Sequence, residues 1–200
     1  VGVWAWRPVA ATLAVALAVA LAAGCSVSSH DVVEEARARG GGLSGELVAV
    51  AVGAVAEDQD VDTPALRSVT VVFTRVILEV AMPADGGLAG AEEVVAYELG
   101  TSGRFGGRGL DGPEEVELPV TGEPLGPSLF TLDQAGVDRF DAMVTTALRE
   151  ADLDGGYAAV ATIARPAGGG DPETVVTVTD GRREVDVTFG PDGAVREVAG

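Results

Sequence analysis

The stretch TLDQAGVDRFDAMVTTALREA, residues 131–151, carries the clearest helix pattern in the chain. Thr131 and Gln134 match a capping box, in which the threonine hydroxyl accepts from the amide three residues on and the glutamine side chain bonds the Thr131 amide. Apolar side chains then recur at spacings of three and four, at Val137, Phe140, Val144, Ala147, Leu148 and Ala151. Because such a stripe must be buried against another layer, we predict a helix over 132–151 packed on a sheet.

Short strand patterns lie on both sides of this helix. At Asp180-Gly181, between two alternating runs, we expect a two-residue hairpin turn with positive φ at both positions, and Pro191-Asp192-Gly193 supplies another turn. Between these turns, apolar and polar residues alternate, which predicts one packed and one solvated sheet face. The predicted strands are 46–56, 68–82, 93–99 and 115–120 before the helix, and 157–165, 173–179, 183–189 and 194–198 after it.

Irregular features interrupt the first half of this pattern. The alternation of 68–82 changes near Thr74-Arg75, which indicates a β-bulge within one long strand, and Gly53 suggests a bulge in 46–56. The glycine-rich segment 101–113 is predicted to be a loop, and it lacks the strand and helix context of a nucleotide-binding loop. Pro119 confines 115–120 to the edge of the sheet.

These elements predict an α+β fold, a curved antiparallel sheet of about six to eight strands with one main amphipathic helix packed on it. Residues 45–200 fall within the size range of one domain, so we expect them to form a single one. Large aromatic side chains are usually buried, so we expect most of those in this region to lie in the core.

The first 24 residues have the pattern of a secretory signal peptide, with Arg7 as the only charged side chain and an uncharged run from Val9 to Ala23. Leu21-Ala22-Ala23-Gly24-Cys25 resembles the lipobox of bacterial lipoproteins. The resemblance implies cleavage between Gly24 and Cys25 and acylation of Cys25, which would anchor the protein to the extracytoplasmic face of the cell membrane. Residues 25–44 would then form a flexible tether. A retained membrane-spanning helix, which needs about 20 apolar residues, is the alternative.

The chain is strongly acidic, with 31 acidic and 13 basic residues and a formal charge of −18. Removal of residues 1–24 takes away Arg7 alone and leaves 12 basic against 31 acidic residues, a charge of −19. Such a field repels nucleic acid and anionic lipid head groups. We therefore expect no nucleic-acid binding and a hydrophobic attachment to the membrane. An envelope protein or a protease is the expected kind of partner.

The acidic segment around Asp58, Asp60 and Asp62 superficially matches the start of a calcium loop. An EF-hand would have glycine where Thr63 stands and glutamate where Val69 stands. A solvated loop is therefore the favoured interpretation, and a calcium site at these three aspartates is the weaker alternative. No other metal site or cofactor is predicted.

The usual catalytic patterns are missing from the sequence. Lysine is absent, the single histidine, His30, lies in the predicted tether, and the single cysteine is predicted to be acylated. No base is left for a Ser-His or Ser-Lys pair. We therefore expect a noncatalytic binding or interaction module. An enzyme that uses an unidentified pair of carboxylates is the lesser alternative.

A second resemblance concerns residues 69–189. The stretch Gly86-Gly87-Leu88-Ala89-Gly90, followed by strand, helix and hairpin patterns, resembles the Gly-Gly-Phe-Ala-Gly stretch of emfourins, small bacterial inhibitors of thermolysin-type metalloproteases. It implies inhibition of secreted proteases as an alternative function, with no inhibitory residue carried over. A helix on an antiparallel sheet is also similar to cystatin-like and PepSY-like envelope domains, and fold alone does not give function.

Overall fold

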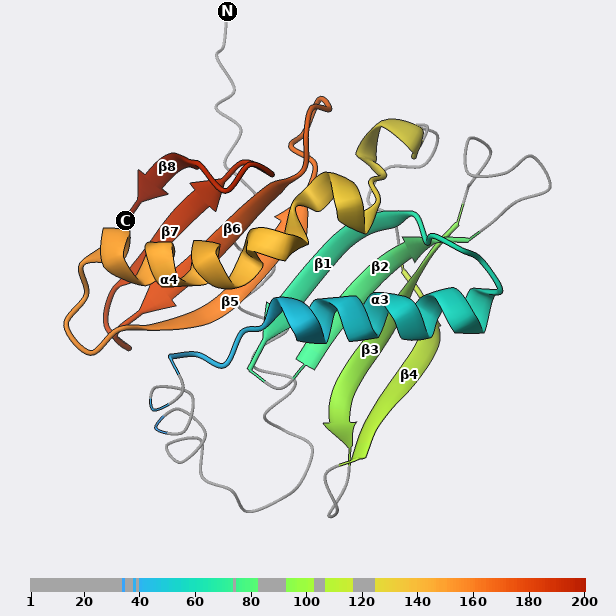
Figure 1. Ribbon diagram of the computed structural model, residues 1–200, viewed down its shortest axis with the longest axis horizontal. Coiled ribbons are helices and arrows are strands. Elements are labelled where there is room, and N and C mark those ends of the chain that lie inside the picture. Colours follow the sequence, from blue (N-terminus) through green and yellow to red (C-terminus); the bar gives the residue numbers. More distant parts are fainter. Residues whose placement is uncertain are drawn as a thin grey trace, which may run out of the picture. The chain divides into compact units, whose positions relative to one another are not determined.

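The computed structural model describes residues 34, 38, 40–73, 75–82, 93–102, 107–116 and 125–200. The chain divides into two units, residues 1–35 and 36–200, and the fold described below belongs to the second. Its elements are α3 (Gly45–Gln59), β1 (Leu66–Val72), β2 (Arg75–Ala81), β3 (Val94–Ser102), β4 (Gly107–Glu115), α4 (Phe140–Ala151), β5 (Tyr157–Ala164), β6 (Glu173–Thr179), β7 (Glu184–Phe189) and β8 (Val195–Ala199), with short 3-10 turns at Gly126–Ser128, Leu132–Ala135 and Val137–Arg139 (Figure 1).

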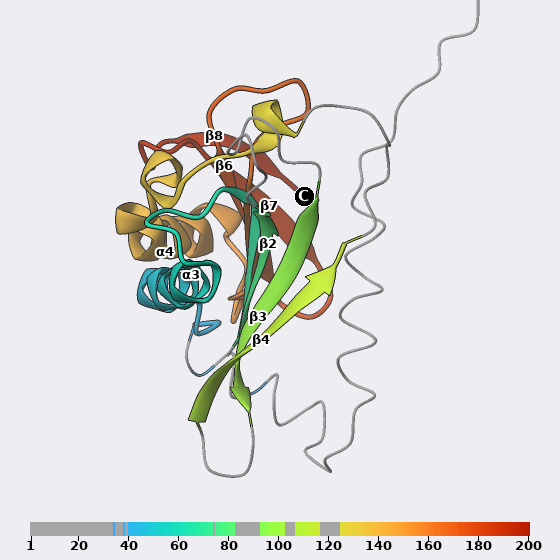
Figure 2. The ribbon, with the colours of Figure 1, turned by 90° about the vertical axis from the view of Figure 1, so that its right-hand side faces the viewer.

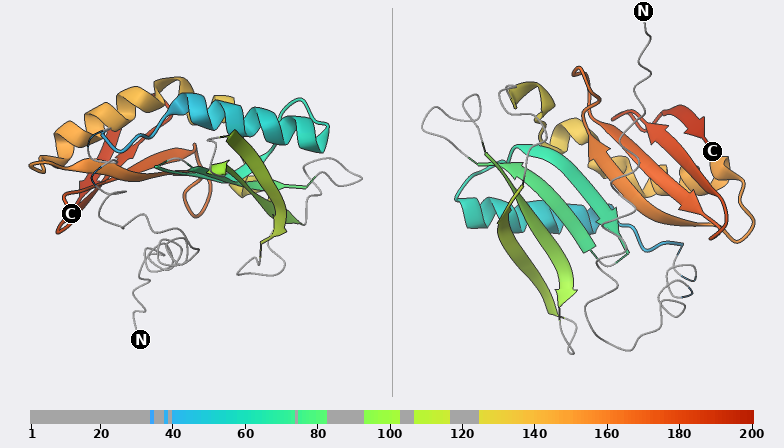
Figure 3. Two further views of the ribbon diagram at one scale, coloured as in Figure 1. Left: turned by 90° about the horizontal axis from the view of Figure 1, so that it is seen from below. Right: turned by 180° about the vertical axis from the view of Figure 1, so that it is seen from behind.

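All eight strands form one antiparallel sheet in the order β4-β3-β2-β1-β5-β6-β7-β8, which confirms the predicted α+β class. A helix followed by a four-stranded meander occurs twice along the chain, and the two meanders join where β1 pairs with β5. Both helices lie on the same face of the sheet, α3 beside the first meander and α4 beside the second (Figures 2 and 3). We call this the inner face, and the opposite one the outer face.

The core fills the space between the inner face and the two helices. Alternate residues of the strands point toward the helices, and each helix buries its own apolar stripe against the sheet. Burial of each large apolar side chain contributes about 1.5–3 kcal/mol relative to leaving it in water. As expected, most described aromatic side chains lie here: Tyr97, Phe130, Phe140, Tyr157 and Phe189.

The prediction of a strand over 46–56 is wrong, because this segment lies within helix α3. Its valines favour a strand, but its buried residues follow the helical spacing of three and four. Gly53 makes no bulge; it lies on the exposed side of the helix, and a Cβ there would meet nothing within 4 Å. The buried residues that share this stripe are Leu47, Val48, Ala51, Val52 and Val55.

The predicted single strand over 68–82 is two strands. Val72 pairs with Arg75, so the chain reverses between them and β1 runs antiparallel to β2. The change of alternation near Thr74-Arg75 therefore marks a hairpin, whereas the irregularity in this pair lies between Leu66 and Ser68. A hairpin turn and a bulge disturb the two-residue period in the same way, so the pattern alone does not separate them.

The predicted loop over 101–113 is also wrong, because β4 occupies Gly107–Glu115 and pairs with β3. The strand predicted at 115–120 shares only Glu115 with it, and residues 117–120 lie outside the described part of the chain. Glycine and proline weaken a central strand but are tolerated at an edge or a bulge. β4 is an edge strand, and Pro113 lies at its register shift opposite β3.

A helix was predicted over 132–151, but the α-helix in this segment begins only at Phe140. The N–H of Thr131 donates to Oε1 of Gln134 at 3.1 Å, as the capping box requires, but the next turns are 3-10 and α4 starts at Phe140. Gly136 separates the two 3-10 turns with a φ of 64°, and a Cβ there would lie 2.0 Å from the carbonyl oxygen of Pro191. The close approach of Gly136 to the β7–β8 turn therefore requires glycine at this break in the helix.

Candidate functional site

The predicted lipidation site is not covered by the described residues. Gly24, Cys25 and His30 all precede residue 34, so cleavage and acylation stay predictions. In the described ranges, no helix is long and apolar enough to cross a membrane. Gly86–Gly90, the stretch that resembles emfourins, also lies outside these ranges. Leu43, at the end of the predicted tether, is only 8% exposed and packs in the core.

The acidic segment lies at the end of α3, where Asp58 and Asp60 make different contacts. Asp58 accepts a 2.8 Å hydrogen bond from the hydroxyl of Tyr97. Asp60 adopts the left-handed conformation with φ 53°, and its N–H donates to the carbonyl groups of Ala56 and Glu57, which ends the helix. Among the residues that the structure describes, no group of three or more histidine, cysteine, aspartate or glutamate side chains could hold a metal ion. Asp58, Asp60 and Asp62 are therefore not gathered into such a group.

The Tyr97–Asp58 contact fastens α3 to the sheet. Tyr97 points from β3 to the inner face and is 2% exposed. Burial, reinforced by the hydrogen bond to Asp58, raises the pKa of the Tyr97 hydroxyl. Loss of its proton would remove the donor and place a charge beside a carboxylate, so the contact requires the neutral phenol.

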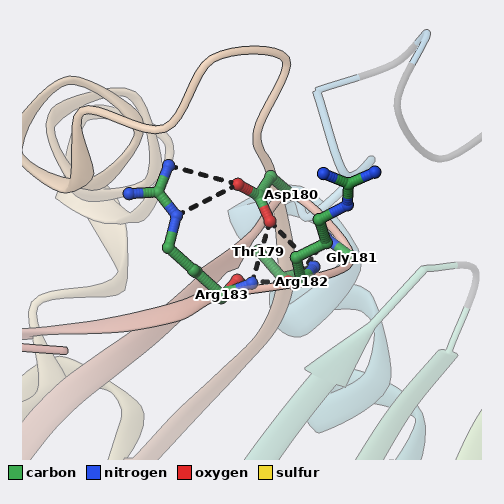
Figure 4. Close-up of polar contacts among 5 residues, drawn as sticks. All are labelled: Thr179, Asp180, Gly181, Arg182 and Arg183. Carbon is green, nitrogen blue, oxygen red and sulfur yellow. Dashed lines mark hydrogen bonds and ion pairs between the residues drawn. The ribbon is translucent and has the colours of Figure 1, made fainter.

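The hairpin between β6 and β7 is a closed polar turn over Asp180–Arg183 (Figure 4). Oδ1 of Asp180 accepts from the N–H groups of Arg182 and Arg183, both at 2.8 Å, and these bonds, with the guanidinium of Arg183, lower its carboxyl pKa. Thr179 Oγ1 accepts from the N–H of Gly181 and donates to the carbonyl of Arg183. The predicted hairpin is confirmed, but only Gly181 has positive φ, so the predicted two-residue turn is wrong.

No described helix covers the outer face of the sheet (Figures 2 and 3). The strand register arranges its side chains in three long rows that run across the strands, and in a short one of Tyr157, Thr179 and Glu184. The first row is Asp111, Glu98, Ile77, Thr70, Thr162, Val175, Thr188 and Glu197. The second is Gly109, Gly100, Arg75, Val72, Val160, Thr177, Asp186 and Ala199. The third is Glu114, Ala96, Glu79, Ser68, Ala164 and Glu173.

The centre of this face carries two ion pairs among neutral side chains, and carboxylates without an ion-pair partner among the described residues lie toward both sides. In the three long rows, the half-buried side chains on β1, β2, β5 and β6 are threonine, valine, isoleucine, alanine or serine, except for Arg75 and Glu79 on β2 and Glu173 on β6. Two cations lie on this face, and both are paired: Arg67 with Glu79 at 2.9 Å and Arg75 with Glu98 at 3.3 Å. Within the described residues, the outer-face carboxylates on β4 and on β6 to β8 have no ion-pair partner: Asp111, Glu114, Glu173, Glu184, Asp186 and Glu197. Asp186 accepts a 2.6 Å hydrogen bond from the hydroxyl of Thr177.

No family model, curated protein or solved structure matches this chain. The sheet places one carboxylate pair directly opposite each other, Glu98 on β3 and Asp111 on β4. This pair lies on an open sheet face, and Arg75 already binds Glu98. Asp111 is exposed, so the described residues do not exclude water from this pair.

Sequence reasoning did not find the outer face. Its rows combine residues from eight strands, and a row exists only once the strand order and every register are known. The sequence does show that these strands have two different faces, because residues of the outer face alternate with core residues in 173–179 and 183–189. That pattern shows that each strand has a second face, but not which side chains the strands place next to one another.

Proposed function

We propose that this protein is a lipid-anchored extracytoplasmic binding module without catalytic activity, and that the outer face of its sheet is the binding surface. The anchor in this proposal is Cys25, on the strength of the lipobox pattern at residues 21–25. The observation that carries the binding role is the layout of the domain. Both helices lie on one face, and within the described residues the opposite face of eight strands is left uncovered.

The size of this face suits a protein partner. Seven interstrand spacings of about 4.8 Å give a width of about 34 Å, and three rows with their side chains cover about 17 Å along the strands. The resulting area of about 600 Å² is of the same order as the roughly 800 Å² per partner in a standard interface. The face is also built on a regular sheet whose other side is a packed core, so binding needs no ordering of a loop.

Site-specific photo-crosslinking tests this proposal in the full chain in its host. A photoreactive phenylalanine analogue replaces Thr162, in the middle of the first outer row, and a matched control replaces the exposed Ala142 on α4. We expect Thr162 to crosslink to another protein and Ala142 not to. Crosslinking at Ala142 alone, or at neither position, would contradict the outer face as the binding surface.

The anchor requires its own measurement. We expect the intact mass of the protein from the membrane fraction to correspond to a chain that starts at Cys25 with added lipid. The variant Cys25→Ala should leave that fraction. A wild-type chain without lipid would remove the anchor from the proposal, while the crosslinking result at Thr162 would still decide the binding role.

A further inference from the structure

The charge layout of the outer face indicates what kind of partner fits it. At one side, β4 presents Asp111 and Glu114. At the other, β6 to β8 present Glu173, Glu184, Asp186 and Glu197. We name these two groups the β4 margin and the β8 margin. Between them lie the neutral centre and the two paired arginines, so the surface carries two separate regions of negative charge.

Unpaired carboxylates at an interface favour a partner of opposite charge. Charge complementarity steers association and suppresses partners of the same sign. Eight carboxylates lie on this face, and Arg67 and Arg75 each pair with one of them, which leaves six (8 − 2) without an ion-pair partner among the described residues. An acidic partner would meet repulsion at both margins. A neutral partner would remove water from some of these carboxylates without supplying an opposite charge, and this desolvation costs free energy.

The neutral centre adds a second requirement. Its half-buried threonine hydroxyls can donate and accept hydrogen bonds with a partner, and burial of its valine and isoleucine side chains would stabilise the complex. A partner segment that crosses this centre needs uncharged or moderately apolar residues there. The margins are five to seven strand spacings apart, about 24–34 Å, and an extended chain of about ten residues spans the widest of these separations.

We propose that the outer face binds a protein segment with two groups of basic residues separated by about ten uncharged positions, one group at each acidic margin. This inference rests on the proposed function and specifies its partner. The segment lies across the strands, with its cations at the β4 and β8 margins and its uncharged middle over Thr70, Thr162 and Val175.

Peptide titration against the full mature chain tests this geometry. The probe is a synthetic peptide with three arginines, about ten serine or threonine residues and three more arginines. Its control has the same composition with all six arginines together. Both have the same charge, so nonspecific attraction to an acidic protein is matched. We expect the split peptide to bind at least fivefold more tightly at physiological salt, and equal affinities would overturn the proposal.

Variants at the margins test the location. The pairs Asp111→Asn with Glu114→Gln, and Glu173→Gln with Glu197→Gln, should each weaken split-peptide binding about tenfold, the effect of removing about 1.4 kcal/mol. The matched control, Asp133→Asn with Asp154→Asn, removes the same charge from exposed positions outside the sheet and should change affinity less than twofold. An equal loss in all three variants would show a net-charge effect only and would overturn the proposal.

The crosslinking at Thr162 separates this inference from the proposed function. A crosslinked protein whose contacting segment is neutral or acidic would overturn the basic partner and leave the binding module standing. Crosslinks to a second copy of this chain, or to its own residues 26–39, would overturn the basic partner as well. Absence of any crosslink would count against the proposed function, whatever the peptides do.

Discussion

The hydroxyl of Tyr97 on β3 donates a 2.8 Å hydrogen bond to Oδ2 of Asp58, one residue before the end of α3. The two residues are separated by 39 positions in sequence, and their contact joins the helix of the first meander to its third strand. It also makes the stability of this helix sensitive to the protonation of a single phenol.

Alkaline pH should weaken the fold through Tyr97. Burial raises the folded-state pKa of Tyr97 above 10.0, so the unfolded chain releases its proton first. The free energy of unfolding is therefore unaffected by this group below about pH 10 and falls as the pH rises through the folded-state pKa. Urea unfolding from pH 8 to 11 should show this fall, and Tyr97→Phe should lack it. Tyr157→Phe is the control, which should keep it; an identical fall in Tyr97→Phe would contradict the assignment.

Gly136→Ala should destabilise the fold strongly. Gly136 has a φ of 64°, and an added Cβ would lie 2.0 Å from the carbonyl oxygen of Pro191. Gly155→Ala is the matched control, because Gly155 has a φ of 66° and open space around it. The control should lose about 1 kcal/mol for the left-handed backbone alone, and Gly136→Ala should lose at least about 2 kcal/mol more. Equal losses on urea unfolding would mean that the close approach to Pro191 is absent.

Gly53→Ala should stabilise the protein by about 0.5–1 kcal/mol, because glycine in a helix interior is unfavourable and this one faces open space. The result also separates the helix from the strand that the sequence predicted, since alanine has little preference for strands. Thermal unfolding and helical circular dichroism measure both effects. A loss of stability would contradict the helical assignment of 45–59.

Asp141 links the two helices across the middle of the layer, because its Oδ1 accepts a 2.9 Å hydrogen bond from the N–H of Gly45. This amide is the first of α3, where a carboxylate also interacts favourably with the helix dipole. Asp141→Ala should therefore cost about 1 kcal/mol. Asp141→Asn keeps an acceptor oxygen and should lose less. If both variants unfold at the urea concentration of the wild type, the contact contributes nothing measurable.

The second meander was predictable because its signals are local. Alternation in 173–179 and 183–189 and the glycine at 181 define a hairpin within a few residues. The first helix was not predictable in this way. Its run of alanine and valine fits a strand by composition and a helix by spacing, and packing against β2 and β3 decides between them.

The outer face required information that no local pattern holds. Thr70 and Thr162 are direct neighbours because β1 pairs with β5, although 92 positions (162 − 70) separate them in the chain. Whether the acids fall on the sheet's margins or in its centre depends on the same long-range pairing. The overall excess of acidic residues was visible in composition, but its division into two groups was not.

The pairing of β1 with β5 also has a consequence for the newly made chain. Synthesis delivers the first meander before the second, so until β5 emerges β1 is an edge with unpaired backbone N–H and C=O groups. Ser68 to Val72, the residues that later pair with β5, would then be open to strands of other chains. A chain that stops after β4 should therefore aggregate instead of persisting as a stable half.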